Sequence, residues 1–276
     1  MARIPDSHPR KNSLESRQKI VDGSSRGLLA DSAMIAHGRG EAFDYLLGER
    51  TTETAREASR ESAARLRNAR RPVISVNGNT VVLAGEGAIR LAAVLGCPIE
   101  VNLYYRTPSR VKGLISLLED WKLRLSEEDA PDGFYGDWKG AVDGVSILGD
   151  SPNFKIDGLE GPRSKCTREG IGGSDTVLVP LEDGDRCEAL ISLGKEVLVV
   201  DLNPLSRSSR MATVTIVDEV SRAFDVILHY LLDDCDYRPT EWDNGKSLKE
   251  SLKEIGDYFS ESVSYTHLTL PTTSCV

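Results

Sequence analysis

Residues 194–218 read GKEVLVVDLNPLSRSSRMATVTIVD, and this stretch sets the architecture that we expect for the rest of the chain. An apolar run at 197–200 ends in Asp201, a loop of serines and arginines follows, and a β-branched run then leads to Asp218. In open parallel sheets, ligands bind beyond the carboxyl ends of the strands. There an aspartate can accept hydrogen bonds from ribose hydroxyls, and arginine can pair with phosphate oxygens. The stretch favours a nucleotide site, and a solvated turn between two strands is the competing interpretation.

The composition is typical of a soluble, globular protein, with 276 residues of which 39% are hydrophobic and 28% charged. The net charge of −9 argues against general nucleic-acid binding, which needs a basic surface. No apolar run approaches the ~20 residues of a membrane span, and MARIPDSHPRKNS at the start lacks the apolar core of a secretory signal. Five scattered cysteines without a CxxC pair fit a reducing compartment. We therefore expect a cytoplasmic protein with small-molecule partners, and neither nucleic acid nor membrane.

Short apolar strands alternate with helices of about ten residues along the middle of the chain. The expected elements lie at 73–76, 87–95, 99–103, 109–118 and 176–181. This alternation predicts βαβ units and a parallel sheet flanked by helices, an α/β fold. Polar loops at 77–79 and 105–107 follow two of the strands, so we expect them to share one pocket.

The segments on either side of this core differ in composition. Residues 1–70 predict a helical N-terminal region packed on the core, with Ser13 as the N-cap of a helix that runs to about residue 21. A second helix is expected within 31–48, interrupted or preceded by a turn at 37–40, and an amphipathic helix covers 51–69.

The core is predicted to span 71–232 and to carry a long loop or insertion at about 119–173. Its second part reads as a loop or lid that brings cations to the site, among them Lys155 and Arg163. Residues 233–276 predict a peripheral extension. Within it, 262–276 contains no acid, lysine or arginine and is expected to be foreign to the fold.

Two places carry candidate catalytic groups. Acids at 182–185 follow a strong strand and could hold Mg²⁺ or accept from an ammonium, although Asp183 or Asp185 could equally cap a helix. His37 is a candidate base, with a hydrogen-bonded structural histidine as the alternative. Two glycines flank Arg39, which would let backbone approach a ligand while the guanidinium reaches it.

Several common motifs do not occur. The sequence has no GxxxxGK[ST], complete GxGxxG, HExxH or GxSxG, so a P-loop kinase, a typical dehydrogenase, a zinc hydrolase and an α/β-hydrolase are poorly supported. The residues themselves point to an anionic ligand, most simply a nucleotide.

Seven blocks in order resemble the archaeal 4-phosphopantoate–β-alanine ligase family, also called phosphopantothenate synthetase. They are IPDSHPR, SRQKIVDG, IAHGRGEAFDYLLGER, VISVNGN, EVNLYYRT, VLVPLEDGDR and VDLNPLSRS…TIVD. The resemblance implies a Rossmann-like core, a cytoplasmic homodimer and synthesis of 4'-phosphopantothenate for coenzyme A. It also implies that ATP is consumed with Mg²⁺, through an acyl-adenylate, and that AMP and diphosphate are released.

The resemblance carries site residues over to this sequence. The implied ATP contacts are Arg17, Arg39, Asp201, Leu202, Asn203, Arg207, Ser208, Glu219 and Val220. The contact at Glu219 departs from the family pattern, in which we expect asparagine. Arg106 and Lys155 are proposed for the substrate phosphate, and the catalytic candidates are His37, Asp183, Asp185 and Arg186.

A second hypothesis is a non-catalytic adenine-nucleotide-binding or regulatory protein on the same Rossmann-like core. It would keep the pocket and lose turnover. A dehydrogenase is a third hypothesis, and the absence of a glycine-rich turn argues against it.

Overall fold

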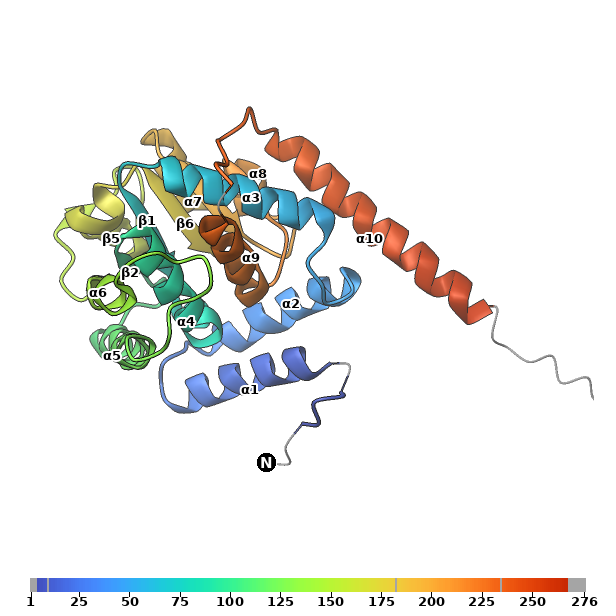
Figure 1. Ribbon diagram of the computed structural model, residues 1–276, viewed down its shortest axis with the longest axis horizontal. Coiled ribbons are helices and arrows are strands. Elements are labelled where there is room, and N and C mark those ends of the chain that lie inside the picture. The colour runs from blue at the N-terminus through green and yellow to red at the C-terminus, as the bar shows by residue number, and fades with distance from the viewer. Residues whose placement is uncertain (1–3, 9, 182, 234, 268–276) are drawn as a thin grey trace, which may run out of the picture.

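The computed structural model of the chain describes residues 4–8, 10–181, 183–233 and 235–267. A six-stranded parallel sheet forms its centre, with the strands in the order β3-β2-β1-β6-β7-β8 (Figure 1). The strands are β1 (Pro72–Val76), β2 (Ile99–Val101), β3 (Ile147–Leu148), β6 (Thr176–Pro180), β7 (Glu196–Val200) and β8 (Val214–Ile216). Counted in chain order this is 3-2-1-4-5-6, the strand order of the Rossmann fold. The predicted α/β fold with a parallel, Rossmann-like sheet is confirmed.

Helices cover both faces of the sheet because alternate strand residues point to opposite sides. On one face, Ile74 and Leu198 pack under α3 (Glu53–Asn68), α4 (Gly78–Leu95) and α9 (Val220–Leu232). On the other, Val73, Val177 and Val197 pack under α7 (Gly184–Ser192), with α8 (Arg207–Met211) beside it. Helices α5 (Pro108–Leu125) and α6 (Trp138–Asp143) pack against α4 and extend the first of these layers.

Helix α4 is the one helix of the described residues that is long and apolar enough to cross a membrane. Most of this helix is buried between the sheet and its neighbours. It therefore has the character of a core helix.

Polar caps begin several helices directly after the strands. Asn77 accepts a hydrogen bond from the backbone N–H of Thr80 at the start of α4, and Ser206 caps α8 in the same way. Glu219 accepts from two backbone N–H groups of α9. Such caps satisfy donors that a helix cannot pair internally, and they keep the loops at the carboxyl ends of the strands short.

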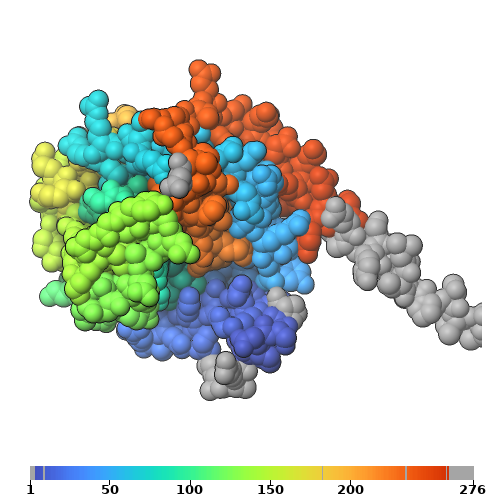
Figure 2. Space-filling view, viewed as in Figure 1, coloured from blue at the N-terminus to red at the C-terminus, as the bar shows by residue number. Residues whose placement is uncertain are grey.

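The two N-terminal helices, α1 (Lys11–Ser25) and α2 (Ser32–Leu46), lie together at one end of the core (Figure 1), and α1 lies along the lower edge of the molecule in Figure 2. The sequence prediction was wrong in two details here. Ser13 lies inside α1, which begins two residues earlier, and α2 runs unbroken through 37–40. A helix tolerates glycine when packing compensates, and Gly40 faces Leu202 at an ordinary contact distance.

The segment 119–173, predicted as a loop or insertion, contains regular structure. It holds the end of α5, α6, an antiparallel pair of β4 (Phe154–Lys155) and β5 (Lys165–Cys166), a 3₁₀ turn η1 (Pro162–Ser164) and η2 (Arg168–Gly172). The buried carboxylate of Glu100 in β2 accepts from the backbone N–H groups of Thr167 and Ile171, both at 2.8 Å. That carboxylate fastens the segment to the sheet.

The C-terminal segment, expected to be peripheral, contributes to the packing. Helix α10 (Asn244–His267) places Leu248 against Leu47 and Leu202. Asn244 accepts a hydrogen bond of 2.8 Å from the backbone N–H of Thr215 in β8. Figure 1 shows α10 running past the ends of α3 and α2. Of the tail predicted to be foreign to the fold, residues 268–276 lie outside the described part of the chain.

Candidate active site

A cavity of about 530 Å³ opens at the carboxyl ends of the parallel strands. Residues that follow β1, β2, β6, β7 and β8 line it, and α1 and α2 form the facing wall. The volume is in the range of small-molecule sites. In sheets of this order, ligands bind at the switch point, which here lies between β1 and β6. The cavity is therefore the candidate active site.

Asn77 bridges the switch point. Its Nδ2 donates to the carbonyl oxygens of Pro180 (3.3 Å) and Leu181 (3.1 Å), while its Oδ1 accepts from the N–H of Thr80 (3.0 Å). One side chain thus joins the ends of β1 and β6 and starts α4. The first turn of α4 lines the cavity, and the free N–H groups at a helix N-terminus attract anions.

The loop after β7 is organised by Asp201. One carboxylate oxygen accepts from the N–H of Asn203 (2.9 Å), and the other accepts from Oγ of Ser206 (2.6 Å). Burial raises the pKa of Asp201, and its hydrogen bonds and the positive charge of Arg39 oppose that rise. Leu202 lines the cavity directly after it. A carboxylate offers about four acceptor positions, so capacity for a ligand hydroxyl remains.

The predicted contacts Arg17 and Arg39 lie near residues of the site, Arg17 beside Glu41 and Arg39 near Asp201. Nε of Arg17 donates to both carboxylate oxygens of Glu41, at 2.7 and 2.9 Å, and Glu41 lines the cavity. Arg10 shares the same carboxylate at 3.1 Å. Arg39 is exposed and acts electrostatically on Asp201. Of the described residues, the lining of the cavity includes neither arginine.

Arg207 lies beside α7. Its guanidinium donates to the carboxylates of Asp185 and Glu188, and all three side chains are about half exposed or more. These pairs lie at the surface, where water screens them strongly. An anionic ligand could therefore replace the two carboxylates at little cost. Ser208, the next predicted contact, is buried in α8.

The candidate catalytic residues at 182–186 do not lie together in the structure. Asp183 caps α7 and accepts from the N–H of Asp185 at 2.9 Å, which is the structural alternative that the sequence allows. Arg186 is 1% exposed and donates to Oγ of Ser75 at 3.0 Å, beneath the sheet and away from the cavity lining. Glu182 lies outside the described residues.

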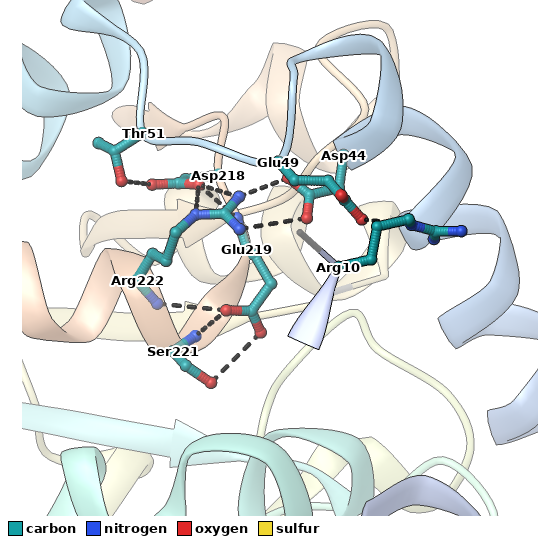
Figure 3. A network of polar contacts seen from close by, with 8 residues as sticks. All are labelled: Arg10, Asp44, Glu49, Thr51, Asp218, Glu219, Ser221 and Arg222. Carbon is teal, nitrogen blue, oxygen red and sulfur yellow. Dashed lines mark hydrogen bonds and ion pairs between the residues drawn. The ribbon is translucent and has the colours of Figure 1, made fainter. Parts of the chain in front are cut away.

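A buried ion-pair network connects α2, β8 and α9 at the edge of the cavity (Figure 3). Arg222 donates from Nε to Asp218 at 2.9 Å and also pairs with Asp44. Thr51 donates to the other oxygen of Asp218 at 2.6 Å. Burial raises the pKa of Asp44, and Arg222 opposes that rise. Glu219 stands beside this network as the cap of α9, and burial raises its pKa as well.

His37 lines the cavity from α2. Its Nε2 is buried and finds no hydrogen-bond partner among the described residues. Burial lowers the pKa of His37, and Arg17 lowers it further, against the opposing effect of Glu41. The imidazole is therefore held in the neutral form, which can accept a proton.

The cations proposed for a substrate phosphate are not those that line the cavity. Arg106 donates to the carbonyl of Gly149, and Lys155 is exposed on β4. The lining instead contains Arg163, from the segment predicted to bring cations, and Arg110, which sequence reasoning missed. The signal available for Arg110 was its place in the first turn of the helix after a strand, near the predicted pocket.

The carboxylates of the cavity do not form a metal cage. The described residues hold no group of three or more His, Cys, Asp or Glu side chains placed to bind a metal ion. Asp44 and Asp218 are paired with Arg222, Glu41 with Arg17, and Glu219 caps a helix. These partners do not fit a resident ion. They leave room for Mg²⁺ that arrives with a nucleotide, which needs only one or two protein oxygens.

Comparisons with known proteins give one consistent family. The phosphopantothenate/pantothenate synthetase family matches residues 54–258. A 4-phosphopantoate–β-alanine ligase of Thermococcus kodakarensis is 45% identical over 264 residues, which cover 93% of this chain and 94% of that protein. The ligases of Thermococcus onnurineus (44% identity, 93% and 94% coverage) and Methanosarcina mazei (39% identity, 96% and 99% coverage) are similar over the same extent.

Proposed function

This chain belongs to the phosphopantothenate/pantothenate synthetase family, and we propose that it joins 4-phosphopantoate to β-alanine through an acyl-adenylate, consuming ATP. It is an enzyme of the ligase class, acting in coenzyme A biosynthesis. The observation that carries this is identity of 39–45% with three 4-phosphopantoate–β-alanine ligases along 93–96% of the chain.

The proposed chemistry activates a poor electrophile. An oxygen of the pantoate carboxylate attacks the α-phosphorus of ATP, and diphosphate leaves. The amine of β-alanine then attacks the acyl carbon, AMP leaves, and a base takes the proton from the nitrogen. The first step joins two anions, so it needs cationic groups around the α-phosphate.

For ATP we propose the residues implied by the family resemblance, on α1, α2 and the loops after β7 and β8. They are Arg17, Arg39, Asp201, Leu202, Asn203, Arg207, Ser208, Glu219 and Val220. Leu202, Glu219 and Val220 line the cavity, which supports this. When ATP binds, the guanidinium of Arg17 would pair with a phosphate in place of the carboxylate of Glu41. The guanidinium of Arg207 would likewise pair with a phosphate in place of the carboxylates of α7. When bound with ATP, Mg²⁺ would neutralise phosphate charge.

For the base we propose His37, with Asp183, Asp185 and Arg186 as the other catalytic candidates. A neutral imidazole in the cavity suits proton abstraction. Asp183 and Asp185 are already engaged with α7 and Arg207, and Arg186 is buried elsewhere. The geometry therefore favours His37 among the four.

A product assay tests the function. We expect AMP, diphosphate and an amide product when ATP, 4-phosphopantoate and β-alanine are supplied together, and no AMP when either acid or amine is omitted. ADP in place of AMP would exclude the adenylate while leaving an amide ligase. ATP binding without any amide product, under saturating substrates, would support the non-catalytic alternative.

We also propose a cytoplasmic homodimer, joined through the outer face of α2. Met34, Ile35, Tyr45 and Leu46 are 47–68% exposed on that helix, and a Cβ added at Gly38 between them would meet nothing within 4 Å from other elements of the described chain. A contiguous exposed apolar face of this kind marks an interface. If the α2 helices of two copies pack antiparallel and cross near Gly38 and Ala42, Ile35 of each copy contacts Tyr45 of the other. The pattern of apolar residues therefore suits a two-fold contact.

Ile35→Glu is expected to convert the dimer to a monomer, since the charge would be buried without a partner at the contact. Light scattering coupled to gel filtration measures the mass. Leu123→Glu is the matched control, because Leu123 is 70% exposed on α5 and should leave the mass unchanged. A dimer that survives Ile35→Glu would place the interface elsewhere.

A further inference from the structure

A second cavity, of about 510 Å³, lies at the amino ends of the parallel strands. Pro72 at the start of β1, Pro98 just before β2 and Ser174 just before β6 line it, together with the last turns of α3 and α4. The first turn of α4 lines the candidate active site instead. The 18 residues of α4 separate the two cavities by roughly 25 Å, at 1.5 Å per residue. One small ligand therefore does not reach both.

The lining of this second cavity is basic, although the chain carries a net charge of −9. The lining contains four arginines and one acid, which are Arg67, Arg70, Arg71, Arg168 and Glu169. The carboxylate of Glu169 accepts from Nδ2 of Asn153 at 3.2 Å. Within the described ranges, no ion pair joins any of the four arginines to a carboxylate. Positive charge of this kind in the wall of a cleft attracts anions.

Arg71 places its guanidinium in the wall of this basic cavity. A Cβ added at Gly173, which also lines the cavity, would lie 3.9 Å from Nη1 of Arg71. The backbone is fixed there, because the N–H groups of Arg70 and Arg71 donate to the carboxylate of Asp175 at 3.0 and 3.1 Å. That carboxylate offsets one positive charge. Burial lowers the pKa of Lys195 behind the wall, and the nearby charge of Arg71 acts in the same direction.

Arg168 reaches the basic cavity from η2. Its guanidinium lies over the ring of Phe154, 5.3 Å from the ring centroid, and its backbone N–H donates to Oδ1 of Asn153 at 2.8 Å. A guanidinium stacked on an aromatic face keeps the donors in its own plane available for oxygen acceptors. Arg71 and Arg168 thus bring two guanidinium groups from distant segments of the chain to one cavity.

Arginines near helix ends can also serve only to compensate the helix dipole. Arg67 has such a role, because its guanidinium donates to the carbonyl oxygens of Tyr230 (3.2 Å) and Leu231 (2.7 Å) at the end of α9. The side chains of Arg71 and Arg168 make no hydrogen bond to a carbonyl oxygen of the described chain. Compensation of a helix end therefore accounts for Arg67 and leaves the other two arginines without a structural role.

We propose that the basic cavity binds a small ligand with two or more phosphate groups, held by Arg71 and Arg168. The planar donors of arginine match phosphate oxygens, and two separate guanidinium groups suit an anion charged at more than one place. Val94, Leu95 and Pro98 line the same cavity and give an apolar wall for the body of the ligand. This site takes no part in the proposed ligase reaction.

Titration calorimetry of the full-length protein with inorganic tripolyphosphate tests the site. We expect the double variant Arg71→Ala/Arg168→Ala to bind one equivalent of tripolyphosphate fewer than the wild-type protein does. Both side chains are exposed, so the variant should fold. Its KM for ATP in the product assay should stay within about twofold of the wild-type value, because the two cavities lie far apart.

Arg56→Ala/Arg60→Ala is the matched control, since it removes the same charge from exposed positions of α3 outside the lining. The control should bind tripolyphosphate as the wild-type protein does. An equal loss in both double variants would show unspecific attraction and overturn the proposal, as would unchanged binding in Arg71→Ala/Arg168→Ala.

A single-stranded oligonucleotide distinguishes the second class of phosphate ligand. If it binds more tightly than tripolyphosphate, and this binding is lost in Arg71→Ala/Arg168→Ala, the surface recognises a nucleic-acid backbone and the small-ligand proposal is overturned. We expect no such binding, because the negative charge of the chain repels a long polyanion. Absence of turnover in the wild-type protein would count against the proposed function, whereas the tripolyphosphate titration alone decides the basic cavity.

Discussion

Arg222→Met is expected to lower the free energy of unfolding by about 3–5 kcal/mol, the usual cost of removing one partner from a buried ion pair. Arg222 lies between Asp44 and Asp218, whose side chains are 7% and 0% exposed. Methionine would fill part of the space and leave two carboxylates without a cation. The variant would also release α2 from α9, so the wall of the cavity should loosen (Figure 3).

The loss in free energy of unfolding caused by Arg222→Met should depend on pH. Burial already raises the pKa of Asp44, and loss of Arg222 would raise it further. When the pKa of a carboxyl is higher in the folded than in the unfolded protein, its contribution to stability is fully present below the unfolded pKa, near 4. That contribution is lost as the pH rises through the folded-state pKa. The difference from wild type should therefore be largest near pH 8 and shrink toward pH 5.

Urea denaturation at the two pH values measures both effects. Arg238→Met is the matched control, because Arg238 forms an exposed pair with Asp236, with side chains 72% and 68% exposed. Exposed pairs contribute little, so this variant should unfold as wild type does. If Arg222→Met proves as stable as the control, the network does not support the cavity wall.

Asp201→Ala is expected to raise the Kd for ATP by roughly 10- to 100-fold. The carboxylate of Asp201 holds the loop after β7 through Asn203 and Ser206, at 2.9 and 2.6 Å. Its loss would free that loop and remove the acceptor proposed for a ribose hydroxyl. Stability should also fall by about 1.5–3 kcal/mol, because hydrogen bonds to a charged group are lost.

Asp175→Ala separates the two effects of Asp201→Ala. Asp175 accepts from the backbone N–H groups of Arg70 (3.0 Å) and Arg71 (3.1 Å), just before β1 and at the end of the sheet opposite the cavity. The control loses the same number of charged hydrogen bonds, so its stability should fall comparably while ATP binding is kept. Equal ATP affinity in both variants would remove Asp201 from the nucleotide site.

The strands and several caps could be predicted because their signals are local. Short apolar runs that end in polar residues gave the strands at 73–76, 176–181 and 197–200 with small shifts at the ends. A cap at Asp183 is also one of the roles that the sequence allows, and Asp183 caps α7. The errors also have local causes. Glycines in α2 suggested a turn, but the helix continues through them.

Which residues line the cavity could be known only from the tertiary structure. Asp44 and Arg222 are 178 residues apart in the sequence, and the residues next to them do not predict that they form an ion pair. Arg110 and Arg163 line the same cavity because Asn102, just after β2, donates to the carbonyl oxygen of Arg163 and holds η1 there. Arg106, four residues from Arg110, donates to Gly149 instead. Periodicity and capping reflect backbone geometry over a few residues, so sequence reveals them. Burial and ion pairing depend on which strands and helices become neighbours, and these are contacts between segments distant in sequence.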